Sequence, residues 1–148
     1  ARLYRQGYIA TSGVVARRDA VLAAGGFDET LPTAQDFALW LSMLCKKGTK
    51  FEIFPGPLLR YHVTSGSIST YTERRLNCTL DIARRFFPTL TTRTRFPMAS
   101  LWYRIIAVHY EALSSYLAQG RIWAAIGVII RTPLNMIKMT ITSGFIQK

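Results

Sequence analysis

Residues 26–40 read Gly-Phe-Asp-Glu-Thr-Leu-Pro-Thr-Ala-Gln-Asp-Phe-Ala-Leu-Trp. Three of the eight acidic residues of the chain, Asp28, Glu29 and Asp36, lie in this stretch. Asp36 stands where a turn-rich segment gives way to an apolar pattern that predicts a helix over residues 36–47. A single carboxylate at such a junction is a candidate general base or substrate anchor, and helix capping is its ordinary alternative.

The sequence predicts strands on both sides of this stretch. β-branched and aromatic residues predict a strand over 8–16, and a short helix is expected over 20–24. After the helix of 36–47, residues 50–55 and 58–63 are two further strand candidates, joined by a Pro-Gly-Pro turn. We therefore expect an α/β unit over residues 1–70.

Beyond residue 70 the pattern changes to helical spacing. Helices are expected over 71–87, ending at Pro88, over 98–118, and over 122–130, with a break at Pro133. We therefore expect an all-helical region over residues 71–148, whose tail carries one apolar stripe made of Leu134, Ile137, Ile141 and Phe145.

The chain has a net charge of +11, and its charged residues are spread unevenly along the sequence. Residues 1–70 hold eight basic and five acidic residues, a net +3, whereas residues 71–148 hold eleven and three, a net +8. A basic half suggests a polyanionic neighbour, such as nucleic acid, anionic lipid or a phosphorylated substrate. Nucleic acid is disfavoured, because no RNA- or DNA-reading motif accompanies the seven arginines between 74 and 104.

The composition also bears on the class of protein and on its cellular environment. An apolar content of 49% argues against a disordered chain. Cys45 and Cys78 have no metal-ligand spacing, which favours a reduced, cytosolic environment. The longest uncharged apolar run, residues 122–130, is about half of a membrane span, so no transmembrane helix is expected.

Several catalytic motifs are missing from the sequence. It contains no phosphate loop, no GxGxxG, no HExxH and no DxD or other tight carboxylate pair for a divalent metal. What remains is an ordered series of short motifs: Arg17-Arg18-Asp19, Gly25-Gly26-Phe27-Asp28-Glu29, Gln35-Asp36-Phe37-Ala38-Leu39-Trp40, Pro57-Leu58-Leu59-Arg60-Tyr61 and Ser65-Gly66-Ser67-Ile68-Ser69.

This series resembles the C-terminal half of the catalytic domain of family 2 glycosyltransferases, in particular members that elongate cell-surface polysaccharides. The resemblance covers residues 10–70 and implies part of a GT-A fold, an α/β architecture, followed by a helical C-terminal region. It also implies that Asp36 is the catalytic base of an inverting transfer. The chemistry agrees, since one carboxylate must take the proton of the acceptor hydroxyl, and a helix start favours the ionised carboxylate.

The same resemblance assigns roles to neighbouring residues. Asp28, Glu29, Gln35 and Arg60 would bind substrate on the acceptor side. The two acids would also shape the acceptor-side loop, with Asp28 the more direct contact, and their ordinary alternative is a role as turn and cap residues. Family members commonly have Glu where this chain has Gln35.

Two aromatic positions have open roles. Trp40 is a sugar platform or, as its apolar helix neighbours favour, a core residue. Many relatives read Tyr-Arg-x-His before the serine loop, whereas here His62 stands at the Arg position and Thr64 at the His position. His62 is therefore a candidate ligand of the metal and diphosphate, with an ordinary role as the alternative.

In the family the nucleotide-sugar site and its Mg²⁺ or Mn²⁺, held by a DxD motif, belong to the preceding half of the domain. The chain starts Ala-Arg-Leu-Tyr and contains no such motif, so we expect a fragment that binds no metal and is inactive alone. The parent enzyme would use a nucleotide sugar and a saccharide or lipid-linked acceptor.

Residues 71–148 would pack on the catalytic part or rest on an anionic membrane, which implies a cytoplasmic protein peripheral to the cytoplasmic membrane. The competing function is a basic helical module that binds nucleic acid or a membrane surface without catalysis.

Overall fold

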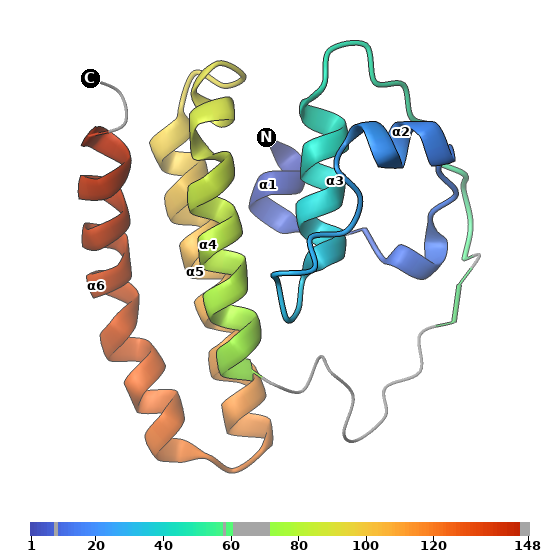
Figure 1. Cartoon of the computed structure of the whole chain (residues 1–148). Helices are drawn as coiled ribbons and strands as arrows, with labels where there is room; N and C mark the ends of the chain where they lie inside the picture. The colour runs from blue at the N-terminus through green and yellow to red at the C-terminus, as the bar shows by residue number, and fades with distance from the viewer. Residues whose placement is uncertain (8, 58, 61–71, 146–148) are drawn as a thin grey trace.

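The computed structural model describes residues 1–7, 9–57, 59–60 and 72–145. Its elements, shown in Figure 1, are α1 (Arg2–Gln6), the 3₁₀ turn η1 (Thr11–Gly13), α2 (Arg18–Ala23), α3 (Gln35–Cys45), α4 (Thr72–Thr91), α5 (Pro97–Ala118) and α6 (Ile122–Phe145). Over these ranges every regular element is helical and none is a strand.

The predicted α/β fold of residues 1–70 is therefore wrong. The described parts of the three expected strands hold only η1 and irregular backbone, while residues 8, 58 and 61–63 of those strands lie outside the described ranges. A strand needs a neighbouring strand to satisfy its backbone groups, and the described chain supplies none. The β-prone side chains of Val15, Phe51 and Ile53 consequently remain 101%, 71% and 81% exposed.

Three long helices form one side of the molecule. α4, α5 and α6 run alternately up and down, and α5 contacts both of the others. α4 forms because its apolar residues recur at helical spacing and face the bundle: Leu76, Thr79, Ile82, Ala83, Phe87 and Leu90 are buried. α1 lies against α5, and α3 contacts α4.

The main hydrophobic core joins the two halves of the sequence. Tyr4, Leu31 and Phe37 pack in one cluster with Ile82 of α4 and Leu101 of α5. The Tyr4 hydroxyl also donates a 2.8 Å hydrogen bond to the carbonyl of Ala83, and its burial raises the pKa of this phenol. Residues from before and after position 70 thus share one core.

Two prolines lie inside helices, where the sequence predicted ends. α4 continues through Pro88 and α6 continues through Pro133. Each proline removes one backbone hydrogen bond, but the helix on both sides of it carries an apolar face buried on neighbouring helices. Burial of those faces outweighs the local cost, so the expected stop at residue 87 and the break near 133 are both wrong.

Because α6 is uninterrupted, it is much longer than the expected run of 122–130. Its segment Ile122–Ser143 is long and apolar enough to cross a membrane by length and composition. Core helices of soluble proteins can pass the same test, but only 17% of this window is buried. The apolar surface of α6 therefore largely faces outward.

Candidate functional site

Asp36 lies in the first turn of α3 with its carboxylate fixed from two directions. The Thr11 hydroxyl donates to Oδ2 at 2.7 Å, and the backbone N–H of Phe37 donates to Oδ1 at 2.7 Å. The side chain is half-buried. Each oxygen retains one lone-pair direction, so the group can accept a further hydrogen bond from an incoming hydroxyl.

The backbone before Asp36 has an unusual conformation. Ala34, the residue preceding α3, has φ 62° and ψ 23°, and it is the one non-glycine residue with positive φ among those described. This left-handed conformation costs an L-residue about 1–2 kcal/mol. Ala34 offers no side-chain cap, so the Asp36 carboxylate takes part of the capping role by accepting the Phe37 N–H.

Asp28 is held within the protein itself. Its Oδ1 accepts hydrogen bonds from the Thr30 hydroxyl at 2.5 Å and the Thr30 N–H at 3.1 Å, and its Oδ2 accepts from Arg85 Nη1 at 2.6 Å. These bonds, that of the Thr30 hydroxyl first and that of Arg85 next, lower the pKa of Asp28 from 3.8 to about 2. The carboxylate thus connects the turn to α4.

Among the described residues, none of the other predicted site residues forms a hydrogen bond with the Asp36 side chain. Glu29 is exposed, and the Gln35 amide donates to the Leu31 carbonyl at 2.7 Å. Trp40 is only 7% exposed, which favours packing over sugar binding, although its Nε1 donates to no acceptor among the described residues. Arg60 is exposed at the end of a described segment.

His62 and the serine loop of 65–69 lie outside the described residues. In the described ranges, no group of three or more His, Cys, Asp or Glu residues could hold a metal ion. The metal expected from the family resemblance therefore has no ligand set in the part of the chain that the structure describes.

A polar network joins the three long helices. Arg131 on α6 forms a two-pronged ion pair with Glu73 on α4, with Nη1 to Oε1 at 2.6 Å and Nη2 to Oε2 at 3.1 Å. The Tyr116 hydroxyl on α5 donates to Glu73 Oε2 at 3.0 Å. The hydrogen bonds from Arg131 and Tyr116 lower the pKa of Glu73.

His109 forms a second polar contact between α5 and α6 inside the bundle. It is 2% exposed, with Nδ1 2.7 Å from the Ile105 carbonyl and Nε2 3.0 Å from the Asn135 amide nitrogen. These partners require a neutral imidazole that donates through Nδ1 and accepts through Nε2. Burial lowers the pKa of His109, which favours this neutral form. With both ring nitrogens engaged, His109 has a structural role.

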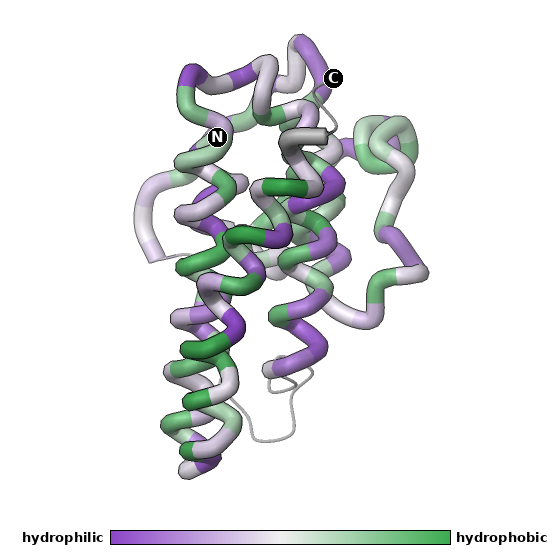
Figure 2. Tube along the Cα trace, turned by 90° about the vertical axis from the view of Figure 1, so that its left-hand side faces the viewer, coloured by the Kyte–Doolittle hydropathy of each residue, from purple (hydrophilic) through white to green (hydrophobic). Residues whose placement is uncertain are grey.

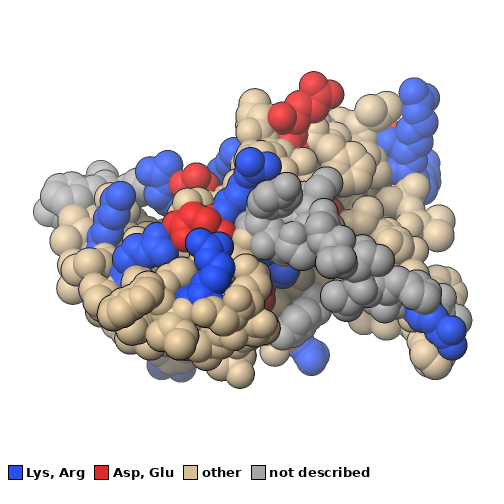
Figure 3. Space-filling view, turned by 90° about the horizontal axis from the view of Figure 1, so that it is seen from below, with Lys and Arg blue, Asp and Glu red and all other residues tan. Residues whose placement is uncertain are grey.

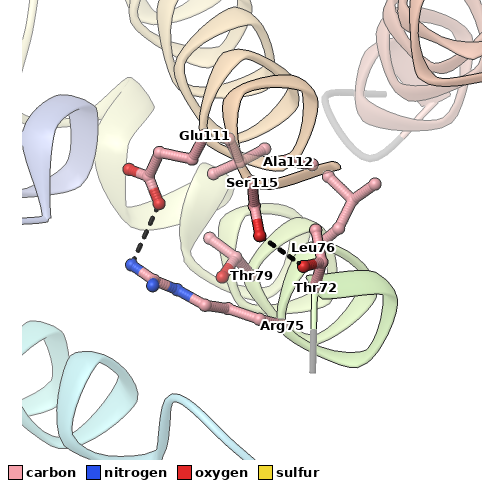
Figure 4. A pocket seen from close by; sticks show the side chains of 8 residues that line it. Thr72, Arg75, Leu76, Thr79, Glu111, Ala112 and Ser115 are labelled. Carbon is pink, nitrogen blue, oxygen red and sulfur yellow. Dashed lines mark hydrogen bonds and ion pairs between the residues drawn. The ribbon is translucent and has the colours of Figure 1, made fainter. Parts of the chain in front are cut away.

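Two cavities lie beside α4. The first, about 50 Å³, lies between α4 and α5 near the Arg75–Glu111 ion pair and the hydrogen bond between Thr72 and Ser115 (Figure 4). It has room for a water molecule or two but not for a sugar. The second, about 350 Å³, lies between α4 and α6, and it is lined by polar residues that include Asp81, Arg84 and Lys138.

Nothing in the sequence indicates two of the hydrogen-bond partners of the candidate residues. Thr11 precedes Asp36 by 25 positions, and Arg85 follows Asp28 by 57 positions. Neither separation corresponds to a helix or strand period, so only the folded chain brings these pairs together.

Comparisons with protein-family models, curated proteins and solved structures gave no match for this chain. The resemblance to family 2 glycosyltransferases therefore rests on the ordered motifs of residues 10–70 alone.

Proposed function

We propose that this chain is the acceptor-side part of an inverting glycosyltransferase in which Asp36 is the general base. The observation that carries the proposal is the two-point fixation of the Asp36 carboxylate by Thr11 and the Phe37 N–H. The order of motifs around Asp36 supplies the reaction class. The proposal concerns the reaction and the base, and it does not depend on a sheet in residues 1–70.

The fixation of Asp36 suits a base. A catalytic carboxylate must hold its proton-accepting oxygen at a fixed position, because small displacements reduce the rate strongly. Two hydrogen bonds on different oxygens restrict rotation of the side chain, and its partial exposure leaves an approach for an acceptor. Asp36 also lies at the positive end of the α3 dipole, which stabilises negative charge.

The proposed step is a displacement at the anomeric carbon of the donor sugar. The acceptor oxygen forms a bond to the anomeric carbon, and the bond from that carbon to the diphosphate oxygen of the donor breaks. The proton of the acceptor hydroxyl passes to a carboxylate oxygen of Asp36. The preceding part of the parent enzyme would hold the donor and its metal.

The arrangement of the arginines argues against the competing nucleic-acid function. Six of the seven arginines between 74 and 104 are engaged within the protein, namely Arg74, Arg75, Arg85, Arg93, Arg95 and Arg104. Arg104 is only 5% exposed and lies over the Phe37 ring. A phosphate-binding surface needs several free cations on one face, so we do not propose nucleic-acid binding.

Ligand binding by the chain itself provides the first test. In saturation-transfer NMR, we expect weak binding of oligosaccharide acceptors and no binding of nucleotide sugars. Asp36→Asn, which keeps the shape and removes the charge, should weaken acceptor binding. Asp19→Asn is the matched control, because Asp19 also lies in the first turn of a short helix, α2, but is bound to Arg17.

Transfer by a longer chain that contains residues 1–148 provides the decisive test. Asp36→Asn should lower kcat by roughly 10²–10⁴-fold with little change in KM for the donor, and Asp19→Asn should leave kcat unchanged. Thr11→Val should lower kcat by a smaller factor, whereas Thr11→Ser, which keeps the hydroxyl, should restore it. Full activity of Asp36→Asn would exclude Asp36 as the base.

A further inference from the structure

The outer surface of α6 carries a continuous apolar stripe. Ile126, Ile129, Ile130, Ile137 and Ile141 are each 41–60% exposed, and Trp123 near the start of the helix is 86% exposed. Their spacing by three, four and seven positions puts them on one side of the helix. Figure 2, which views the molecule from the side of α6, shows hydrophobic segments recurring along this part of the chain.

α5 extends the stripe into a broader surface. Trp102, Tyr103, Ile106 and Tyr110 on α5 are 42–68% exposed and again share one side of their helix. The indole Nε1 of Trp102 donates to the Thr140 hydroxyl on α6 at 3.0 Å, so the two apolar sides adjoin where the helices meet. We call the combined surface, defined by these α5 residues and the α6 stripe, the outer face.

Charged groups border the outer face without entering it. α6 has two charged residues over its described length, Arg131 and Lys138, seven positions apart and therefore on the same side. That side faces α4, because Arg131 pairs with Glu73 and Lys138 lines the cavity between α4 and α6. On α5, Arg104 is buried and Glu111 pairs with Arg75.

The border of the outer face is positive. Two basic residues, Arg121 and Lys138, lie at this border, and neither forms an ion pair with a carboxylate of the described residues. Arg121 lies exposed in the turn between α5 and α6, over the Tyr116 ring. Figure 3, seen from below, shows Lys and Arg side chains, with Asp and Glu side chains among them, beside a broad uncharged area.

We propose that the outer face lies in the interfacial region of a membrane that contains anionic lipids. An uncharged apolar stripe with flanking Lys and Arg, together with Trp and Tyr, is typical of helices that lie along a bilayer. Protein interfaces are usually depleted in Lys, whereas the border here complements anionic headgroups. This surface is independent of the proposed catalytic role of Asp36.

A helix that lies along the membrane fits α6 better than one that crosses it. Arg131 and Asn135, in the middle of the apolar segment, are bonded to Glu73 and His109 of the other two long helices. Crossing the bilayer would carry these polar groups and their partners into hydrocarbon, at a cost of several kcal/mol. Lying along the surface keeps them on the aqueous side.

Vesicle flotation of the 148-residue chain tests the proposal. We expect the chain to float with vesicles of phosphatidylcholine and phosphatidylglycerol in equal parts, and to float less with phosphatidylcholine alone or in high salt. The triple variant Ile126→Ser, Ile130→Ser and Ile137→Ser should lose roughly tenfold in partitioning per side chain. The variants Arg121→Gln and Lys138→Gln should weaken binding to the anionic vesicles alone.

The chain offers a matched control for the triple variant. Val15→Ser, Phe51→Ser and Ile53→Ser remove three side chains that are at least as exposed but lie outside the outer face. This control should float like the unchanged chain, and circular dichroism should show that both triple variants keep their helices. Equal flotation of the outer-face variant and the unchanged chain would overturn the proposal.

Tryptophan fluorescence distinguishes the remaining outcomes. Emission should shift to the blue when vesicles are added, and brominated lipid should quench it, with Trp123→Phe reducing both effects and Trp102, also on the outer face, retaining the rest. An unshifted Trp123 in the bound chain would overturn the proposal. Absence of flotation, combined with a dimer in sedimentation that the outer-face variant dissociates, would replace the membrane by a second copy of the chain.

Discussion

Arg85 on α4 donates a hydrogen bond from Nη1 to Oδ2 of Asp28 at 2.6 Å, and this ion pair ties the acidic turn before α3 to the helical bundle. The turn carries the motif from which a catalytic role was inferred, so its position relative to α4 depends on the pair. Asp28 therefore has a structural role in holding the turn against the bundle.

The Asp28–Arg85 pair predicts a specific acid sensitivity. Because Asp28 has a pKa of about 2 in the folded protein, below its ordinary value of 3.8, the unfolded chain takes up the proton first as pH falls. The stabilisation by Asp28 is therefore present above about pH 4 and is lost as pH falls toward 2. Arg85→Gln should reduce the difference in urea midpoint between neutral and acid pH. Arg84→Gln removes the same charge one residue away and should leave that difference intact.

A second prediction concerns the contact between Gly7 and Arg104. Gly7 has φ +71°, and a Cβ there would lie 2.8 Å from Nη1 of Arg104. Arg104 has little freedom to move, because it is 5% exposed and stacked 4.5 Å above Phe37. The left-handed conformation alone costs a residue with a Cβ roughly 1–2 kcal/mol. Gly7→Ala should therefore destabilise the protein by more than this amount, because the new Cβ also meets Arg104.

Gly26→Ala is the matched control for that measurement. Gly26 has nearly the same φ, +70°, but a Cβ there would meet no atom within 4 Å. Chemical denaturation of both variants separates the conformational cost from the steric one. Equal losses would show that Arg104 moves aside and that the close approach at Gly7 is unimportant.

Local signals in the sequence were sufficient for α3 and α5, but not for the course of α4 through Pro88 or of α6 through Pro133. α5 spans Pro97–Ala118 against an expectation of 98–118, because Pro97 suits the first helical turn and Gly120 follows the end. α3 spans Gln35–Cys45 against an expectation of 36–47. In both helices the apolar spacing and the end signals lie within the element itself, so the sequence contains the information needed.

The sequence does not show which segments would pair with the expected strands, or which residues contact the site residues. Phe51 and Ile53 have high strand propensity, but a strand forms only where another strand meets it, and propensity does not reveal a partner. Asp36 could be located at a helix start from the sequence, whereas its partner Thr11 could not, since the contact spans 25 residues. Burial of Trp40 followed from its apolar neighbours on α3.

A third prediction uses the buried histidine. His109 should titrate below 6.5 in the folded protein, because burial and the nearby Arg131 lower its pKa, while the Ile105 carbonyl and Glu73 only partly oppose them. The unfolded state then binds more protons as pH falls below about 6.5, so stability is greatest above that pH and declines toward the folded pKa. NMR titration of the imidazole measures this directly, with His62→Gln used to assign the two histidine signals. A midpoint above 6.5 would contradict the neutral state of His109 that its two hydrogen bonds require.

The uninterrupted course of α6 gives the last prediction. Pro133 lies inside the helix and is exposed, so replacing it by Ala creates no cavity and restores a backbone donor. An interior proline costs about 3 kcal/mol relative to alanine, and part of this should be regained by Pro133→Ala as a higher urea midpoint. Pro97→Ala is the control, because a proline in the first turn of α5 loses no helical bond and its replacement should change stability by less than about 0.5 kcal/mol. If α6 instead broke at Pro133, the stripe from Ile126 to Ile141 would be divided between two helices. Pro133→Ala would then leave stability unchanged or lower it.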